Sequence, residues 1–134
     1  MGDQNTCRGL TYTDEALYFF AQILQDKPQP NLLYADHDYQ DSQGTLQNPC
    51  FKPDWNPDMF TSTNYIQHPV WIRDDVLKDS NGWCPEYAGA MDYELLLRLT
   101  RGIKQEQVLH VHRALAHLRA PRKTCSTCGK ILTI

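Results

Sequence analysis

The stretch LLYADHDYQDSQG, residues 32–44, constrains the fold most, because an apolar run ends abruptly in acidic residues. Residues 31–35 are predicted to form a short buried strand, and Asp36 and Asp38 follow where we expect that strand to end. In open α/β sheets, ligands lie beyond the carboxyl ends of the strands. Carboxylates two residues apart on an extended chain share one side of it, so both can approach the same ion.

Such a pair of carboxylates has two interpretations. Carboxylate oxygens favour Mg²⁺ or Mn²⁺ over Zn²⁺, and a metal held by one or two of them keeps coordination positions for substrate phosphates. The alternative is a solvated turn, because so short a motif arises often by chance. The motif alone leaves both interpretations open.

Hydrophobic periodicity predicts two helices in the chain. The first begins after its cap Thr13 with Asp14 and Glu15 in its first turn, carries an apolar stripe over residues 16–24 and ends at residues 26–28. The second covers residues 91–100, with Gly102 placed to end it. Weaker patterns predict the remaining elements, which are strands at 64–66, 70–72, 107–111 and 114–118, a helical turn at 74–78, a long loop at 40–58 and a flexible loop at 85–90.

The totals exclude several classes of protein. The 134 residues, 41% hydrophobic and 22% charged, suit one globular domain. A net charge of -3 offers no basic face to a nucleic-acid backbone, and no apolar run is long enough to cross a bilayer. The N-terminus has no apolar core of a secretory signal, and the five cysteines are an odd number. We therefore expect free thiols and a cytoplasmic protein.

A second motif is GAMDYELLLRL, residues 89–99, in which Gly89 and Ala90 lead into a helix with Asp92 and Glu94 in its first turn. Acidic residues at a helix N-terminus offset the helix dipole, which stabilises it by about 0.3–1 kcal/mol. The functional interpretation makes one of these acids a general base beside a flexible glycine loop.

Two further segments carry aromatic and imidazole groups. In FKPDWNPDMF, residues 51–60, two prolines fix the backbone around Trp55, whose ring is predicted either to hold a sugar or to cover the core. In HVHRALAHLR, strand alternation puts His110 and His112 on one side, and His117 follows. A lone histidine is more often a surface or core residue than a ligand.

The order and spacing of LLYADHDYQDSQG, FKPDWNPDMF, NYI, AMDYELLLRL and ALAHLR resemble the C-terminal, acceptor-side half of a GT-A-type glycosyltransferase of family 2, over residues 10–119. The resemblance implies a partial GT-A domain at residues 1–120, an α/β Rossmann-like sheet with flanking helices. A polar Cys-x-x-Cys tail, expected to be flexible, follows at 121–134. The implied activity moves a sugar from a nucleotide-diphosphate donor to the hydroxyl of a saccharide or lipid-linked acceptor.

The resemblance also implies a metal site. Asp36 and Asp38 match the family's metal motif, and His117 matches the histidine that completes the metal or phosphate site, with His110 as the second choice. Bound Mg²⁺ or Mn²⁺ would bridge the two donor phosphates and neutralise the leaving group.

Further roles follow from the same resemblance. Asp92 matches the catalytic base, and its in-line chemistry inverts the anomeric configuration. Gly89 and Ala90 match the loop that the acceptor approaches, and Trp55 and Asn64 are candidate sugar or acceptor contacts.

The family's N-terminal nucleotide-binding half has no counterpart in these residues. We therefore expect the chain alone to bind a nucleotide sugar poorly or not at all. An open sheet edge would favour a partner chain or self-association. The inner face of the membrane is a second expected location.

Two other interpretations stay open. The first is a non-catalytic remnant or interaction module with the same fold. The second is a small zinc-binding protein, because Cys125 and Cys128 supply half of a tetrahedral zinc site that Cys7, Cys50 or Cys84 could complete. The alternative to zinc binding is that these two cysteines are free thiols in a disordered tail.

Overall fold

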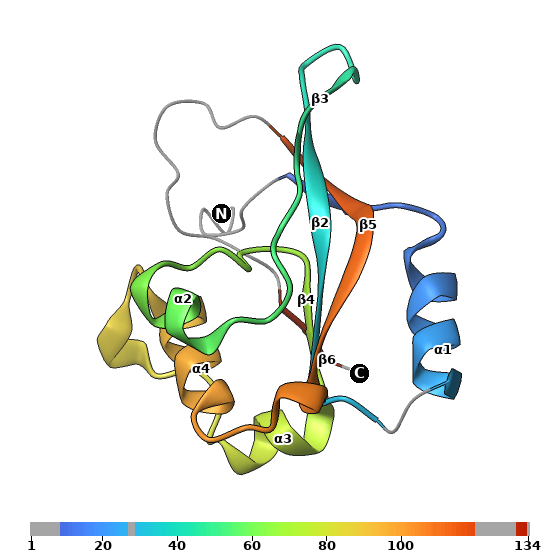
Figure 1. The fold of residues 1–134 in the computed structure, drawn as a ribbon. Helices are drawn as coiled ribbons and strands as arrows, with labels where there is room; N and C mark the ends of the chain where they lie inside the picture. The colour runs from blue at the N-terminus through green and yellow to red at the C-terminus, as the bar shows by residue number, and fades with distance from the viewer. Residues whose placement is uncertain (1–8, 27–28, 120–130, 134) are drawn as a thin grey trace.

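The computed structural model describes residues 9–26, 29–119 and 131–133, and a six-stranded mixed sheet forms its centre (Figure 1). β2 (Leu32–Gln40) runs parallel to β5 (Val108–Arg119) and antiparallel to β3 (Leu46–Cys50) and β4 (Val70–Ile72). β4 pairs with the first residues of β2, and β3 pairs with the residues of β2 that follow them. Apart from β3, the strands follow the order β1 (Leu10–Tyr12), β5, β2, β4 and β6 (Ile131–Thr133). The predicted α/β class is confirmed, and the sheet is consistent with a partial Rossmann-like fold.

Helices cover both faces of this sheet (Figure 1). Leu33, Ala35 and Trp71 pack against α1 (Ala16–Asp26), whereas the alternate residues of the same strands face the opposite core. None of the helices in the described residues combines the length and the apolar character needed to cross a membrane. The other helices are α2 (Pro57–Ser62), α3 (Asp74–Asp79) and α4 (Met91–Thr100), with short 3₁₀ turns η1 (Pro85–Tyr87) and η2 (Gln105–Gln107).

The apolar stripe of α1 forms the contact that the periodicity predicts. Ala16 and Phe20 are buried, and the rings of Phe20 and Trp71 lie 3.5 Å apart between centroids. The expected side-chain cap is absent, because the Thr13 hydroxyl is buried and finds no hydrogen-bond partner among the described residues. The Thr13 carbonyl instead accepts a hydrogen bond from the Ala16 N–H, at 3.1 Å.

α4 begins and ends where the sequence predicts. Leu95 and Leu96 are buried against β2 and α2, in a core that includes Tyr34 and Phe60. Beyond the helix, Gly102 has φ +74°, a conformation that glycine adopts without the steric cost of a Cβ. The predicted strand at 70–72 and helical turn at 74–78 are confirmed as β4 and α3.

Four predictions near the sheet are wrong. The strand at 31–35 continues to Gln40, because β3 and β5 supply hydrogen-bond partners to its polar second half. Asp36 and Asp38 therefore lie within β2 rather than beyond its end. The predicted loop at 40–58 contains β3, and residues 64–66 form no strand. The two strands expected at 107–111 and 114–118 are one strand, β5, with register shifts opposite β2.

The predicted tail lies mostly outside the described residues. Cys125 and Cys128 belong to that part of the chain, so no structural statement is made about them. Residues 131–133 form β6, which pairs in parallel with β4 and so places this short segment at an edge of the sheet.

The packing of α4 generates a stability prediction. Leu95→Ala is expected to lower the free energy of unfolding by about 2–5 kcal/mol, because it leaves a cavity in the core between α4 and the sheet. The matched control is Leu17→Ala on α1, where the side chain is 75% exposed and the expected change is within about 0.5 kcal/mol. Urea denaturation at pH 7 measures both, and equal losses would contradict the assignment of Leu95 to the core.

Candidate functional site

Asp36 is the buried acid at the centre of the sheet. Its side chain is only 4% exposed, and its Oδ1 accepts a hydrogen bond from the backbone N–H of Lys52 at 2.9 Å. The same oxygen lies 2.7 Å from Nε2 of His110 on β5. Asp36 therefore joins β2 to the neighbouring strand β5 and to the segment that follows β3.

Asp38 meets a different histidine. The register of β2 and β5 places Asp38 opposite His117, and Oδ1 of Asp38 makes a short contact with Nδ1 of His117. Both side chains are partly accessible, at 13% and 20% exposure. The structure thus brings together two of the three expected metal ligands, while Asp36 is directed to His110 instead.

Lys52 clamps the segment after β3 onto the sheet. It is buried, and its Nζ donates hydrogen bonds to the backbone carbonyls of Ala35 at 2.6 Å and of His68. Burial lowers the pKa of Lys52 to about 7, although the charges of Cys50 and Asp36 oppose this shift. Near neutral pH this lysine therefore carries only part of a positive charge.

His37 lies between Asp36 and Asp38 on β2. Its side chain is fully buried, and neither ring nitrogen makes a well-formed hydrogen bond within the described residues, although the His68 backbone is nearby. Burial lowers the pKa of His37 to about 4, and the Lys52 charge acts in the same direction. The middle residue of the Asp-x-Asp motif is therefore a neutral core side chain at pH 7.

Asp92, the expected catalytic base, lies in the first turn of α4. The indole N–H of Trp83 donates a hydrogen bond to its Oδ1 at 3.0 Å. Burial lowers the pKa of His68 to about 4, and the Asp92 carboxylate opposes that shift, so the two side chains lie within electrostatic reach. The backbone carbonyl of His68 accepts a hydrogen bond from Lys52, whose own N–H bonds to Asp36, so Lys52 and His68 lie between Asp36 and Asp92.

The other expected substrate contacts lie in different settings. Gly89 and Ala90 are exposed just before α4, and Gly89 has φ +93°. Oδ1 of Asn64 accepts a hydrogen bond from the backbone N–H of Gln67 at 3.2 Å. Trp55 is only 7% exposed and packs against Phe60, so it covers the core, which is one of the two roles that the sequence left open.

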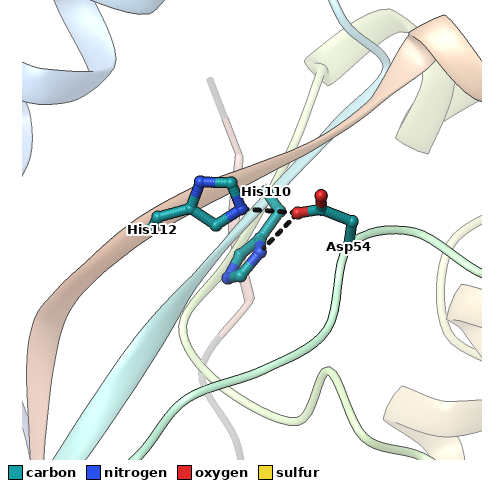
Figure 2. Close-up of side chains that lie close together, drawn as sticks. All are labelled: Asp54, His110 and His112. Atoms are coloured by element: carbon teal, nitrogen blue, oxygen red, sulfur yellow. Dashed lines mark hydrogen bonds and ion pairs between the residues drawn. The ribbon is translucent and has the colours of Figure 1, made fainter.

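A second group of polar side chains lies beside Asp36 (Figure 2). Oδ1 of Asp54 lies 3.0 Å from Nδ1 of His110 and 2.5 Å from Nε2 of His112. The prediction that these histidines share one side of the strand is confirmed. Hydrogen bonds with His112 and then with His110 lower the pKa of Asp54.

Sequence reasoning missed Lys52, Asp54 and His68 as parts of this region. The alternating His-x-His pattern pointed to β5, but nothing in the sequence placed Asp54 against it. Lys52 and His68 are single polar residues next to prolines, and their burial depends on the path of the chain between β3 and β4.

Comparison with known proteins adds two relatives. No protein-family model matches the sequence. The chain is 34% identical over 119 residues to the O-antigen biosynthesis protein RfbC of Myxococcus xanthus, covering 89% of this chain and 9% of that protein. It is 30% identical over 106 residues to the uncharacterized protein y4gI of Sinorhizobium fredii (strain NBRC 101917 / NGR234), covering 79% of this chain and 12% of that protein. The chain thus spans about a tenth of the length of these curated relatives.

The buried His37 makes the fold sensitive to acid. The unfolded chain binds a proton at an ordinary histidine pKa of 6.5, whereas the folded chain binds it only near pH 4. The unfolded state therefore holds more protons between these values, so stability falls as the pH drops from 6.5 to 4.

We predict that His37→Leu weakens this acid sensitivity. Compared with the wild type, the variant should lose less unfolding free energy between pH 7 and pH 4, by up to about 3 kcal/mol. Part of the dependence of the unfolding free energy on pH should remain in the variant, because burial also lowers the pKa of His68 to about 4. Urea denaturation at several pH values measures the difference, with pH 8 as the reference at which both histidines are neutral. Parallel curves for the two proteins would contradict the prediction.

Proposed function

We propose that this chain forms the acceptor-side part of a GT-A glycosyltransferase of family 2 that acts in glycan biosynthesis. It would transfer a sugar from a nucleotide-diphosphate donor to the hydroxyl of a saccharide or lipid-linked acceptor. Two lines of support are the order of the sequence motifs and the 34% identity, over 89% of the chain, to a protein named for O-antigen biosynthesis.

One structural observation carries the proposal. Asp36 and Asp92 are far apart in the sequence, yet Lys52 hydrogen-bonds both to Asp36 and to the backbone carbonyl of His68, and the His68 ring lies within electrostatic reach of Asp92. A glycosyl transfer site needs carboxylates that hold a cation for the donor phosphates and a separate carboxylate for the acceptor hydroxyl. In this proposal Asp38, two residues along β2 from Asp36, belongs to the first group and Asp92 is the second.

Asp92 is the proposed general base. The acceptor oxygen attacks the anomeric carbon, the bond between that carbon and the diphosphate oxygen breaks, and Asp92 takes the hydroxyl proton. A single in-line displacement of this kind inverts the anomeric configuration. The Trp83 indole N–H holds one carboxylate oxygen of Asp92, which positions the base at the start of α4.

The exposed residues before α4 suit the approach of an acceptor. Gly89 has open space around the position that a Cβ would occupy, so the backbone there leaves room for a saccharide. Ala90 is also exposed and immediately precedes the helix that carries Asp92. These two residues are the proposed acceptor loop. Asn64 stays a proposed contact, and Trp55 supports the site from the core.

The side chains around β2 fit a divalent cation only in part. Asp38 and His117 meet and are partly accessible, so they are the residues that would hold Mg²⁺ or Mn²⁺. Asp36 is turned toward His110 and Lys52, which makes it a positioning residue in this proposal. When bound, the cation would offset the negative charge of the leaving diphosphate.

The assignment of Asp92 has a direct test. Asp92→Asn keeps the shape of the side chain but removes its basicity, so sugar transfer should fall at least about 100-fold with little change in acceptor KM. Because the chain alone is expected to bind a nucleotide sugar poorly, the assay supplies it with the nucleotide-binding half of a family 2 enzyme, Mn²⁺, labelled UDP-, GDP- and dTDP-sugars, and lipid-linked saccharide acceptors.

The matched control for this test is Asp58→Asn. Asp58 is likewise an acid in the first turn of a helix, α2, and it is exposed. Its substitution should leave transfer unchanged. Retained transfer in Asp92→Asn would contradict the assignment of the base, and no transfer by the wild type with any donor would favour the non-catalytic interpretation.

A further inference from the structure

We propose that Asp54, His110 and His112 bind a divalent transition metal ion, with zinc as the ion that their chemistry fits best. This site is distinct from the Asp38–His117 pair, and the inference does not depend on sugar transfer. Within the described residues, these three side chains form a group whose candidate ligand atoms all lie within 4.8 Å of one another.

The three side chains converge from two separate parts of the chain (Figure 2). His110 and His112 project from β5 on the same side, and Asp54 reaches them from the segment between β3 and α2. Zinc binds imidazole nitrogen and carboxylate oxygen at about 2.0–2.2 Å, so three such atoms in this small volume can surround one ion after small side-chain adjustments.

His110 is held as a ligand before any ion arrives. Its side chain is 3% exposed, and its ring stacks on Tyr34 with 4.7 Å between ring centroids and 8° between planes. The Asp36 carboxylate lies 2.7 Å from Nε2 of His110 and favours the proton on that nitrogen. Nδ1 of His110 is then the nitrogen that an ion would take, by replacing the proton that Nδ1 shares with Asp54. A carboxylate behind a ligating histidine is the usual outer-shell arrangement of zinc sites.

The donor set indicates which metal suits the site. Two imidazoles and one carboxylate suit zinc and its first-row neighbours, whereas Mg²⁺ prefers oxygen ligands. The side chains of Asp54 and His112 are 75% and 70% exposed, so solvent reaches this side of the cluster. Three protein ligands with an accessible side resemble a zinc site that keeps one position for water or an anion.

Metal binding here has a structural consequence. The ion would link the segment between β3 and α2 to β5. In the ion-free structure, Asp36 and Asp54 already join that segment to β5 through hydrogen bonds. A ligand that binds only the folded state stabilises it. Zinc should therefore raise the melting temperature of the chain.

The test is a zinc titration of the metal-free full chain against a chromophoric chelator. We expect one equivalent of zinc for the wild type. Asp54→Ala and His112→Ala should each weaken binding more than the roughly 10–100-fold that loss of an outer-shell partner costs. Both side chains are exposed, so these substitutions should preserve the fold, which circular dichroism checks.

Two controls separate this site from other sources of zinc binding. Asp58→Ala removes an exposed carboxylate of α2 and should keep full affinity. A double variant, Cys125→Ser with Cys128→Ser, removes the Cys-x-x-Cys thiols and should also keep the one equivalent. Co²⁺ as a second probe should give visible absorption bands in the wild type that His112→Ala abolishes.

The outcomes are distinct. The proposal would be overturned if the double cysteine variant lost zinc binding while Asp54→Ala and His112→Ala kept it. The absence of stoichiometric zinc binding by the wild type would also overturn it. Asp92→Asn should bind zinc as tightly as the wild type. The zinc titration therefore tests the proposed metal site, and the transfer assay tests the proposed glycosyltransferase activity, independently of each other.

Discussion

The buried carboxylate of Asp36 is the interaction on which the organisation of this region depends. A charged carboxylate in a protein interior is costly unless hydrogen bonds and opposite charge compensate it. The Lys52 N–H and His110 provide that compensation, and the Lys52 ammonium lies close enough to interact with it. Each partner comes from a different part of the chain, so satisfying one carboxylate fixes the segment after β3 and the ring of His110 against β2.

The three residues of the Asp-His-Asp motif face three environments. His37 is fully buried, beside Tyr39 and close to the His68 backbone, whereas the two aspartates meet histidines of β5. Shifts in the register of β2 and β5 around Asp36 then give the aspartates different partners, His110 for Asp36 and His117 for Asp38. The motif suggests that both aspartates bind one ion, but Asp36 is a buried structural acid and Asp38 is partly accessible.

Burial also sets the charge balance of the region. It lowers the pKa of Lys52 to about 7 and that of His68 to about 4, so the groups between Asp36 and Asp92 carry little positive charge near neutrality. The low positive charge of Lys52 and His68 follows from the burial of these two basic side chains.

The sequence by itself determined the α/β class, the presence and C-terminal end of α1, the extent of α4, and the position of His110 and His112 on one side of a strand. These features depend on local periodicity, which the order of apolar residues specifies. Only the tertiary structure decided that Asp36 would bind His110, that Trp55 would lie in the core and that Asp54 would face two histidines. Those contacts join residues far apart in the chain, and they depend on strand register and on the path of a segment whose own sequence shows no periodicity.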